Sequence, residues 1–331
     1  MKPIIFSGMQ ATGVPSLANY IGAIKNWVKL QENYHCLYCI ANLHSITIRQ
    51  DPETLREKSR ELLTLFIALG LDPKENVVYY QSHVPAHTEL AWILNCYTYM
   101  GELNRMSQFK DKSQKHENNI NSGLFTYPVL QAADILLFKA NLVPIGEDQK
   151  QHLELCRDVA IRFNNIYGSV FTIPEPYVAS VGARVMSLQE PDKKMSKSES
   201  SNKNNVVYLL DKPDIVMKKF KRATTDSFNQ IRHNPEEQPG VSNLLAIYAC
   251  VSNRTIEECV REFADGHGYG QLKTRVGEAV VAVLEPIQKR YEKLKADPIY
   301  IDGVIKDNAK KANAMAQDTL STVKDAIGFP H

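Results

Sequence analysis

In the stretch Pro3-Ile4-Ile5-Phe6-Ser7-Gly8-Met9-Gln10-Ala11-Thr12-Gly13, a short apolar run that predicts a strand leads directly into a turn-rich loop. Apolar residues then recur at helical spacing over 17–30. The pattern next predicts buried strands over 36–41 and 77–80, with a helix over 52–69 between them. Strands that alternate with helices predict an α/β fold with a parallel sheet.

The rest of the chain changes character near residue 205. Before that point we expect helices over 88–109, 128–138 and 147–163, an exposed polar loop over 110–121 and a strand over 142–145. The segment 191–205 is almost entirely polar, which is typical of a mobile loop or a linker. Helical patterns follow over 213–223, 242–251, 255–264, 274–296 and 308–327. The chain therefore divides into an α/β half and a helical half.

The length of 331 residues allows two domains, or one large domain with an insert. Hydrophobic residues make up 44% and charged residues 23%, which excludes long-range disorder. The longest apolar run, 62–71, is about half of a bilayer span, and the N-terminus is too short and wrongly built for a secretory signal. We therefore expect a cytoplasmic protein that does not enter membranes.

The charge balance excludes a protein that coats nucleic acid indiscriminately, because 39 basic and 37 acidic residues leave a net charge of only +2. A local RNA-binding patch is still compatible with it. The stretch Cys36-Leu37-Tyr38-Cys39 has the spacing of a metal or redox motif, but it lies in a predicted strand with no second pair nearby. We therefore expect two core thiols there.

Several polar residues lie where ligands bind in α/β folds. The loop after the first strand, and Gly146-Glu147-Asp148-Gln149 after a later one, lie where parallel strands end. Each is equally explained as an ordinary turn or a helix cap. Asp134 shares one face of an apolar helix with Tyr127 and Gln131, so it either pairs inside the core or accepts a proton donor from a ligand.

The motif Lys194-Met195-Ser196-Lys197-Ser198 gives these separate signals a common explanation. Its composition alone fits either a solvated linker or a flexible loop whose lysines bind a polyphosphate. The motif is a strong signal when it follows an α/β half, as it does here. With it, the chain resembles class I aminoacyl-tRNA synthetases, and within that class the bacterial tryptophanyl-tRNA synthetases. The matching blocks run nearly end to end and include 6–8, 38–44, 101–110, 127–136, 143–152, 182–188 and 239–245.

The resemblance implies an activity, partners and a domain plan. Such an enzyme activates L-tryptophan with ATP and Mg²⁺ to tryptophanyl-adenylate, releases pyrophosphate and transfers tryptophan to tRNA(Trp). It is usually a homodimer. The implied plan has a Rossmann-like class I catalytic domain over 1–205, with an inserted helical or dimer region at about 88–140 and the lysine motif at 194–198. A helical anticodon-binding domain over 206–292 and C-terminal helices over 293–331, packed back on the catalytic domain, complete it.

The resemblance also implies a tryptophan site. On the family pattern Asp134 would accept the indole N–H, and Tyr127, Gln149 and Gln131 would hold the α-amino group. The residues near the carboxylate would be Gln10 and His44, and the site would also include Phe6 and Gly8.

The implied catalytic groups act on the phosphates. Lys112, Lys194 and Lys197 would stabilise charge on the departing pyrophosphate, and Asn19 would lie near the phosphates. The implied ATP contacts are Gln10, Thr12, Gly13, Ala18, Asn19, Gly146, Asp148, Gln149, Val185, Lys194, Met195, Ser196, Lys197 and Ser198.

Metal binding by the protein itself is not expected. No side chain is predicted to ligate a metal. Some family members carry an iron–sulfur cluster on closely spaced C-terminal cysteines, but only Cys250 and Cys259 lie in that region here, so we expect none.

Three departures from the family pattern cluster at the predicted site. Ala18 replaces a glycine under the adenine, Asn42 replaces an acid and Gln131 replaces a methionine. The last change produces the arrangement of tyrosyl-tRNA synthetases, so a tyrosine-specific relative is one alternative. A weakened paralogue that binds RNA or tryptophan as a regulator is another. The basic cluster over 218–222 is either a solvated face or an RNA contact.

Overall fold

The computed structural model describes residues 2–109, 120–146, 149–177, 184–196, 202–263, 266 and 268–330. The chain forms two compact units. The first contains Met1–Thr12, Leu30–Val178 and Asp297–His331, and the second contains Gly13–Lys29 and Ala179–Ala296. Each unit therefore unites segments that are far apart in the sequence.

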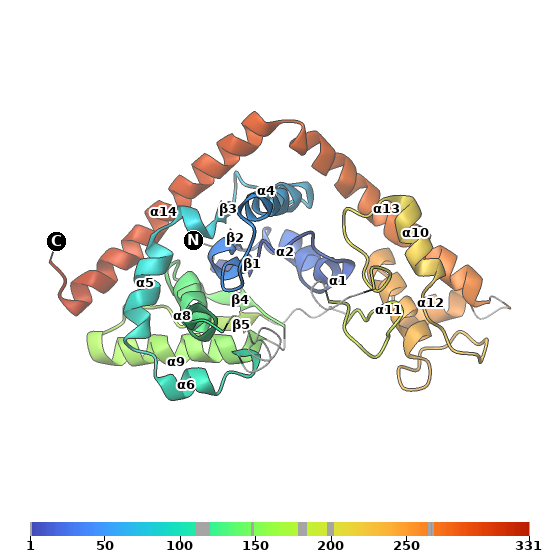
Figure 1. Ribbon diagram of the computed structural model, residues 1–331, viewed down its shortest axis with the longest axis horizontal. Helices are drawn as coiled ribbons and strands as arrows, with labels where there is room; N and C mark the ends of the chain where they lie inside the picture. The colour runs from blue at the N-terminus through green and yellow to red at the C-terminus, as the bar shows by residue number, and fades with distance from the viewer. Residues whose placement is uncertain are drawn as a thin grey trace. The chain divides into compact units, whose positions relative to one another are not determined.

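The first unit is built on a five-stranded parallel sheet of order β3-β2-β1-β4-β5 (Figure 1). The strand order reverses beside β1, where β2 lies on one side and β4 on the other. Ligands in open α/β sheets bind outside the carboxyl ends of the strands at such a reversal. The predicted parallel sheet is thus confirmed. The strands are β1 (Ile4–Met9), β2 (His35–Ile40), β3 (Val77–Tyr80), β4 (Leu142–Pro144) and β5 (Glu175–Tyr177).

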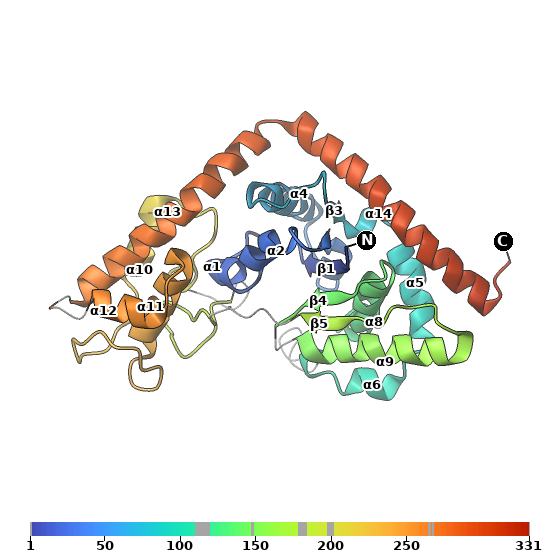
Figure 2. The same ribbon diagram turned by 180° about the vertical axis from the view of Figure 1, so that it is seen from behind.

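Helices cover this sheet and share its apolar core. The helix α8 packs between α5 and α9, and α14 runs along β3 and α5 (Figure 1 and Figure 2). Asp51 caps α4 by accepting from Thr54 N at 2.8 Å, as its Asp-Pro start predicts. The helices are α3 (Asn42–Ser45), α4 (Pro52–Ala68), α5 (Ala86–Asn95), α6 (Met100–Asn104), α8 (Ser122–Leu136), α9 (Lys150–Tyr167) and α14 (Pro298–Ile327), with a 3₁₀ turn η2 (Gln81–His83).

The helix α8 corrects one prediction. It was expected to begin at Pro128, but it begins at Ser122, and Pro128 lies inside it. Asn121 caps the earlier start, because its side chain accepts from Leu124 N at 3.0 Å. The expected helix over 88–109 is likewise divided into α5 and α6, because Tyr99 has extended backbone angles.

The second unit is mainly helical in the part that the structure describes. The helix α10 packs on α13, which also contacts α11. A Cβ at Gly277 would lie 2.8 Å from Met217 Sδ, so the missing side chain lets α10 approach α13 closely. The elements are α1 (Leu17–Asn19), a π-helical turn η1 (Tyr20–Ile24), α2 (Lys25–Leu30), α10 (Pro213–Lys221), α11 (Pro239–Ser252), α12 (Ile256–Glu262) and α13 (Tyr269–Lys295).

Among the described residues, no helix combines the length and apolar character needed to span a bilayer.

Candidate functional site

The centre of the site is Asp134 on α8, which is only 3% exposed. His44 Nε2 lies 2.8 Å from its Oδ2. Gln81 Nε2 donates to Oδ1 at 2.7 Å, while Gln81 Oε1 accepts from Leu43 N and fixes the amide. His87 Nδ1 lies 2.6 Å from Oδ1, without the alignment of a hydrogen bond. The carboxylate is therefore held from α3, η2 and α5 together.

These neighbours keep the Asp134 carboxylate charged. Burial raises the pKa of Asp134, but the positive charge that His87 and His44 can carry outweighs it and holds that pKa well below its ordinary range. A carboxylate offers about four acceptor positions, two on each oxygen. His87 and Gln81 face Oδ1, whereas His44 alone faces Oδ2. Among the described residues, one acceptor position on Oδ2 therefore has no protein donor, and we call it the open acceptor position.

A second polar network begins one turn away on α8. The Tyr127 hydroxyl lies 3.0 Å from His152 Nε2, and Gln149 Oε1 lies 3.2 Å from His152 Nδ1. Gln131 Nε2 donates to the same Gln149 oxygen at 3.3 Å. Burial raises the pKa of Tyr127, so its hydroxyl keeps its proton. The structure thus brings Tyr127, Gln131 and Gln149 together through His152.

The two networks meet at His44, whose ring lies edge-on to Tyr127 with centroids 6.2 Å apart. The oxygen of the Gln131 side chain has no hydrogen-bond partner in the described part of the chain, and this residue is half-buried. An amide oxygen without a hydrogen-bond partner is an acceptor that suits an ammonium group.

The strand β1 ends next to these networks. Phe6 is buried and stacks on Phe138 with centroids 6.1 Å apart, whereas Gly8 is exposed. A Cβ at Gly8 would make only ordinary contacts, 3.7 Å from Cys39 O and from the Phe6 ring. The glycine is thus not required by the packing of the chain, and it leaves this edge open.

Of the remaining residues predicted for the first unit, Gln10 is half-buried, and Thr12 and Gly146 are exposed. Asn42, where the family pattern has an acid, donates to Ser82 Oγ at 2.8 Å and accepts from Ser82 N at 2.9 Å. It therefore connects α3 to η2.

The other predicted ATP-binding residues belong to the second unit. Asn19 Oδ1 accepts from Ser16 N at 2.9 Å, and Asn19 N donates to Ser16 Oγ at 3.3 Å, so the two residues form a capping box at α1. Among the described residues, Asn19 Nδ2 has no acceptor. Gly13 has φ +129°, a conformation that favours glycine, and Ala18 is half-buried.

The lysine motif begins in an ordered turn of the second unit. Met195 N donates to Val185 O at 3.1 Å, and Met186 forms an antiparallel bridge with Lys194. Asn243 of α11 clamps the Met186 backbone at N–H and C=O, at 2.8 and 2.9 Å. Val185 and Met195 are buried, Ser196 is half-buried and Lys194 is exposed, while Lys112, Asp148, Lys197 and Ser198 lie outside the described residues.

The chain after this motif is tied to the loop before α1. Leu209 N donates to Pro15 O at 3.0 Å, and Leu17 N donates to Val207 O at 2.8 Å. Lys219 is 5% exposed, and its Nζ lies 2.6 Å from Asp211 Oδ2 and 2.7 Å from Val206 O. The hypothesis that Lys219 belongs to a solvated or RNA-binding face is therefore wrong, because its ammonium group is buried and paired with Asp211 inside the unit.

The sequence analysis did not assign a role to several residues of these networks, namely Gln81, His87, His152 and Ser16. One signal in the sequence points to Gln81 and His87. They follow the strand at 77–80, so they lie near the carboxyl end of a parallel strand, where ligands bind.

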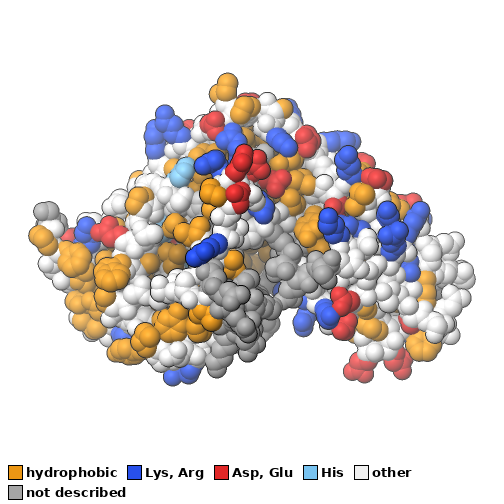
Figure 3. Space-filling model, viewed as in Figure 1, with side chains coloured by type: hydrophobic (Ala, Val, Ile, Leu, Met, Phe, Trp, Pro, Cys, Tyr) orange, Lys and Arg blue, Asp and Glu red, His pale blue; other side chains and the backbone are white. Residues whose placement is uncertain are grey.

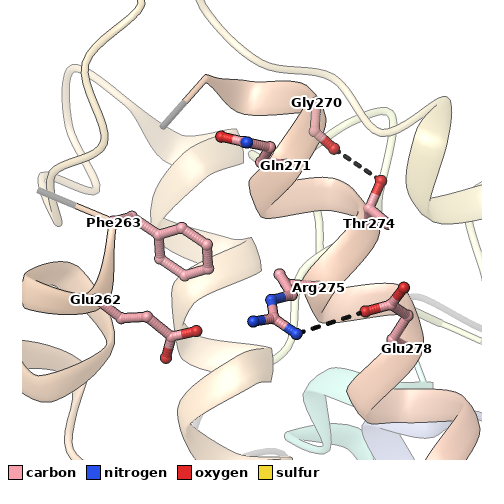
Figure 4. Close-up of a pocket in the computed structure, with 7 residues that line it drawn as sticks. All are labelled: Glu262, Phe263, Gly270, Gln271, Thr274, Arg275 and Glu278. Carbon is pink, nitrogen blue, oxygen red and sulfur yellow. Dashed lines mark hydrogen bonds and ion pairs between the residues drawn. The ribbon is translucent and has the colours of Figure 1, made fainter. Parts of the chain in front are cut away.

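The second unit also contains a cavity of about 500 Å³ between α12 and α13. Glu262 at its edge is paired with Arg254 and Tyr248, whereas Arg275 lies 3.9 Å from Glu278 (Figure 4). Its lining residues are Glu262, Phe263, Gly270, Gln271, Thr274, Arg275 and Glu278. The described residues contain no group of three or more His, Cys, Asp or Glu side chains arranged to hold a metal ion.

Known proteins with similar sequences and structures cover almost the entire chain. A tryptophan–tRNA ligase from Clostridium tetani (strain Massachusetts / E88) is 53% identical over 328 residues, which span 99% of this chain and 96% of that protein. The tryptophanyl-tRNA synthetase structure from Mycoplasma pneumoniae has a TM-score of 0.89 at 35% identity, over 100% of this chain and 99% of that one. The Campylobacter jejuni enzyme, complexed with ADP and tryptophan, has a TM-score of 0.84 at 34% identity, over 98% and 100% of the two chains.

The parallel sheet and these structural neighbours have the Rossmann-like fold of this enzyme class. The family described as "tRNA synthetases class I (W and Y)" matches residues 1–285. With that match and a 53% identical relative along nearly its whole length, the chain belongs to the class I tRNA synthetases for tryptophan and tyrosine.

Proposed function

We propose that this aminoacyl-tRNA synthetase is a tryptophan–tRNA ligase. It activates L-tryptophan with ATP to tryptophanyl-adenylate, releases pyrophosphate and transfers tryptophan to tRNA(Trp). The 53% identical relative carries this activity in its name, and a neighbouring structure holds ADP and tryptophan.

The observation that carries the specificity proposal is the open acceptor position on Asp134 Oδ2. Asp134 is buried and ionised, and it lies on the apolar face of α8. An indole N–H would complete its hydrogen bonding. An apolar ring without that donor would leave a buried charge short of one partner, which costs binding energy.

The second network would hold the amino-acid backbone. Gln131 Nε2 donates to Gln149 Oε1 at 3.3 Å. The same Gln149 oxygen and the Tyr127 hydroxyl both contact the His152 ring, at 3.2 and 3.0 Å. Together they would bind the α-ammonium group. Gln10 and His44 would lie near the carboxylate, and Phe6 and Gly8 would line the site.

The adenylation step requires positioned charge rather than a protein nucleophile, because the tryptophan carboxylate attacks the α-phosphate and pyrophosphate leaves. Asn19 Nδ2 would donate to a phosphate oxygen, since Ser16 already occupies its Oδ1. Lys112, Lys194 and Lys197 would stabilise charge on the departing pyrophosphate. Mg²⁺ would accompany ATP as part of the substrate. The other predicted ATP contacts are Thr12, Gly13, Ala18, Gly146, Asp148, Val185, Met195, Ser196 and Ser198.

The helical segment 206–292 would bind the anticodon end of tRNA(Trp). Three basic residues of α10 and its C-cap, Lys218, Lys221 and Arg222, are exposed and suit phosphate contacts. The cavity between α12 and α13 is a second concave polar surface in this segment (Figure 4). The segment 1–205 would be the catalytic domain, and 293–331 would complete it.

The enzyme would act as a cytoplasmic homodimer formed through the region 88–140 and its neighbours. Large apolar side chains are exposed on α5, α6 and α9, and orange side chains gather over these helices in Figure 3. An uncovered apolar surface of this kind favours association. The residues include Trp92, Tyr99, Met100, Ile161 and Ile166, of which Trp92 is 73% exposed.

One experiment tests the proposed activity against its alternatives. ATP–pyrophosphate exchange is measured with tryptophan, with tyrosine and without amino acid. We expect exchange only with tryptophan. Exchange with tyrosine would support the tyrosine-specific alternative that Gln131 permits, and no exchange in any arm would support a regulatory paralogue.

A further inference from the structure

His87 contacts Oδ1 of Asp134, the carboxylate oxygen that does not carry the open acceptor position. It is completely buried, with Nδ1 2.6 Å from Asp134 Oδ1 and Nε2 3.1 Å from the Tyr79 hydroxyl. Its ring stacks on Tyr79, with centroids 5.8 Å apart and an angle of 17° between the planes, and packs against Phe138 at 5.6 Å. Tyr79, His87 and Asp134 thus form a continuous buried row.

Both nitrogens of the His87 ring make close contacts along this row. Burial, with Cys39 and Asp134 adding to it, raises the pKa of Tyr79 well above its ordinary value, so the hydroxyl keeps its proton and can donate to His87 Nε2. The other ring nitrogen, Nδ1, contacts Asp134 Oδ1 at 2.6 Å. The Tyr79 hydroxyl thus fixes the ring that packs against Oδ1.

This arrangement affects the two carboxylate oxygens differently. Gln81 Nε2 donates to Oδ1 at 2.7 Å and His87 Nδ1 contacts the same oxygen at 2.6 Å, so Oδ1 has two protein partners. Oδ2, which only His44 faces, is then the oxygen turned toward a ligand. Removing the His87 contact with Oδ1 would let the carboxylate rotate about its Cβ–Cγ bond. The open acceptor position on Oδ2 would then no longer be held in one orientation.

We propose that Tyr79 and His87 are positioning residues that aim Asp134 Oδ2 and so determine the preference for a ring that carries an N–H donor. Neither residue touches the substrate. This inference rests on the proposed role of Asp134 as the indole acceptor. It predicts that loss of the Tyr79 hydroxyl weakens recognition of the indole nitrogen specifically.

The test compares tryptophan with 3-benzothienylalanine, in which sulfur replaces the indole N–H. The measured quantity is the ratio of kcat/KM for the two amino acids in ATP–pyrophosphate exchange. The variants are Tyr79→Phe and His87→Gln, with Asp134→Ala as the reference for complete loss. Tyr97→Phe is the matched control, because it removes a tyrosine hydroxyl that lies 2.7 Å from Tyr167, away from Asp134.

We expect the ratio to fall about three- to tenfold in Tyr79→Phe, at least as much in His87→Gln, and not in the control. The value of kcat/KM for the sulfur analogue should stay within twofold of the parent. An equal loss for both amino acids would overturn the inference, since a merely structural role affects both alike.

The Asp134→Ala variant separates this inference from the proposal on which it rests. If Asp134→Ala abolishes the preference for tryptophan while Tyr79→Phe and His87→Gln leave it unchanged, the acceptor role stands and the positioning role fails. If Asp134→Ala itself leaves the ratio unchanged, both fail. Tyr79→Phe keeps the test decisive if the more severe His87→Gln variant does not fold.

Discussion

Replacing Lys219 by methionine should destabilise the second unit strongly, although the residue lies on a helix with otherwise exposed lysines. The substitution keeps most of the side-chain length but removes the ammonium group. Asp211, whose side chain is 17% exposed, then loses its partner at 2.6 Å, and Val206 O loses its donor at 2.7 Å. Tyr208 N alone would still donate to Asp211 Oδ2.

The magnitude follows from the burial of the pair. Lys219 and Asp211 side chains are 7% and 17% exposed, so solvent screens them little. Removing one partner of such a buried pair costs about 3 kcal/mol or more, because the other charge stays buried and uncompensated. For a unit of this size the melting temperature should fall by roughly 6–12 °C.

The assay is urea or thermal unfolding followed by circular dichroism. The matched control is Lys221→Met, which removes an exposed lysine from the same helix and should change the free energy of unfolding by less than about 0.5 kcal/mol. The double variant Asp211→Asn with Lys219→Met should recover part of the loss, because no buried charge remains unpaired. A Lys219→Met variant as stable as the control would refute this reasoning.

Three further predictions concern the active site. Ala18→Gly should lower the KM for ATP without changing the KM for tryptophan, because a methyl group under the adenine would be removed; an unchanged or higher KM for ATP would mean that the methyl is accommodated. Lys197→Ala should lower kcat for adenylate formation far more than it raises the KM for tryptophan. An unchanged single-turnover rate of adenylate formation would mean that the 194–198 motif is only a linker. The lowered pKa of Asp134 should make the folded state lose stability as the pH falls below about 4, so the stability advantage of the parent over Asp134→Asn should shrink between pH 6 and pH 3. A difference that stayed constant with pH would contradict that shift.

The fold was predictable where a local signal determines it. Asp51 and Pro52 mark the start of α4 through a cap and a fixed backbone angle, and the structure confirms both. The same Asp-Pro signal precedes the last helix: apolar spacing predicts it only over 308–327, but it begins at Pro298, where Asp297 caps it. Such boundaries depend on capping atoms rather than on apolar spacing.

Other features depend on contacts that no local pattern contains. The expected helix over 17–30 contains a π-helical turn at Tyr20–Ile24, which apolar periodicity does not distinguish from an α-helix. Lys219 has the spacing of a surface lysine, and only its packing against Asp211 shows that it is buried. Cys36 and Cys39 are both buried free thiols in β2, as their position in an apolar strand indicated.

The candidate site was predictable in its members but not in its connections. Helical spacing placed Tyr127, Gln131 and Asp134 on one face, and it left open whether Asp134 pairs within the core or binds a ligand. The structure shows three protein partners from other elements together with one unused acceptor position. Pairing within the core is therefore confirmed, whereas ligand binding at Asp134 stays a prediction.

We infer that Asp134 selects tryptophan, and the kinetics of ATP–pyrophosphate exchange in Asp134→Ala will show whether it does. Losing a charge-assisted hydrogen bond to the indole should cost roughly 1.5–3 kcal/mol, so kcat/KM for tryptophan should fall about 10- to 100-fold or more while circular dichroism shows a retained fold. A value of kcat/KM within threefold of the parent would contradict the claim.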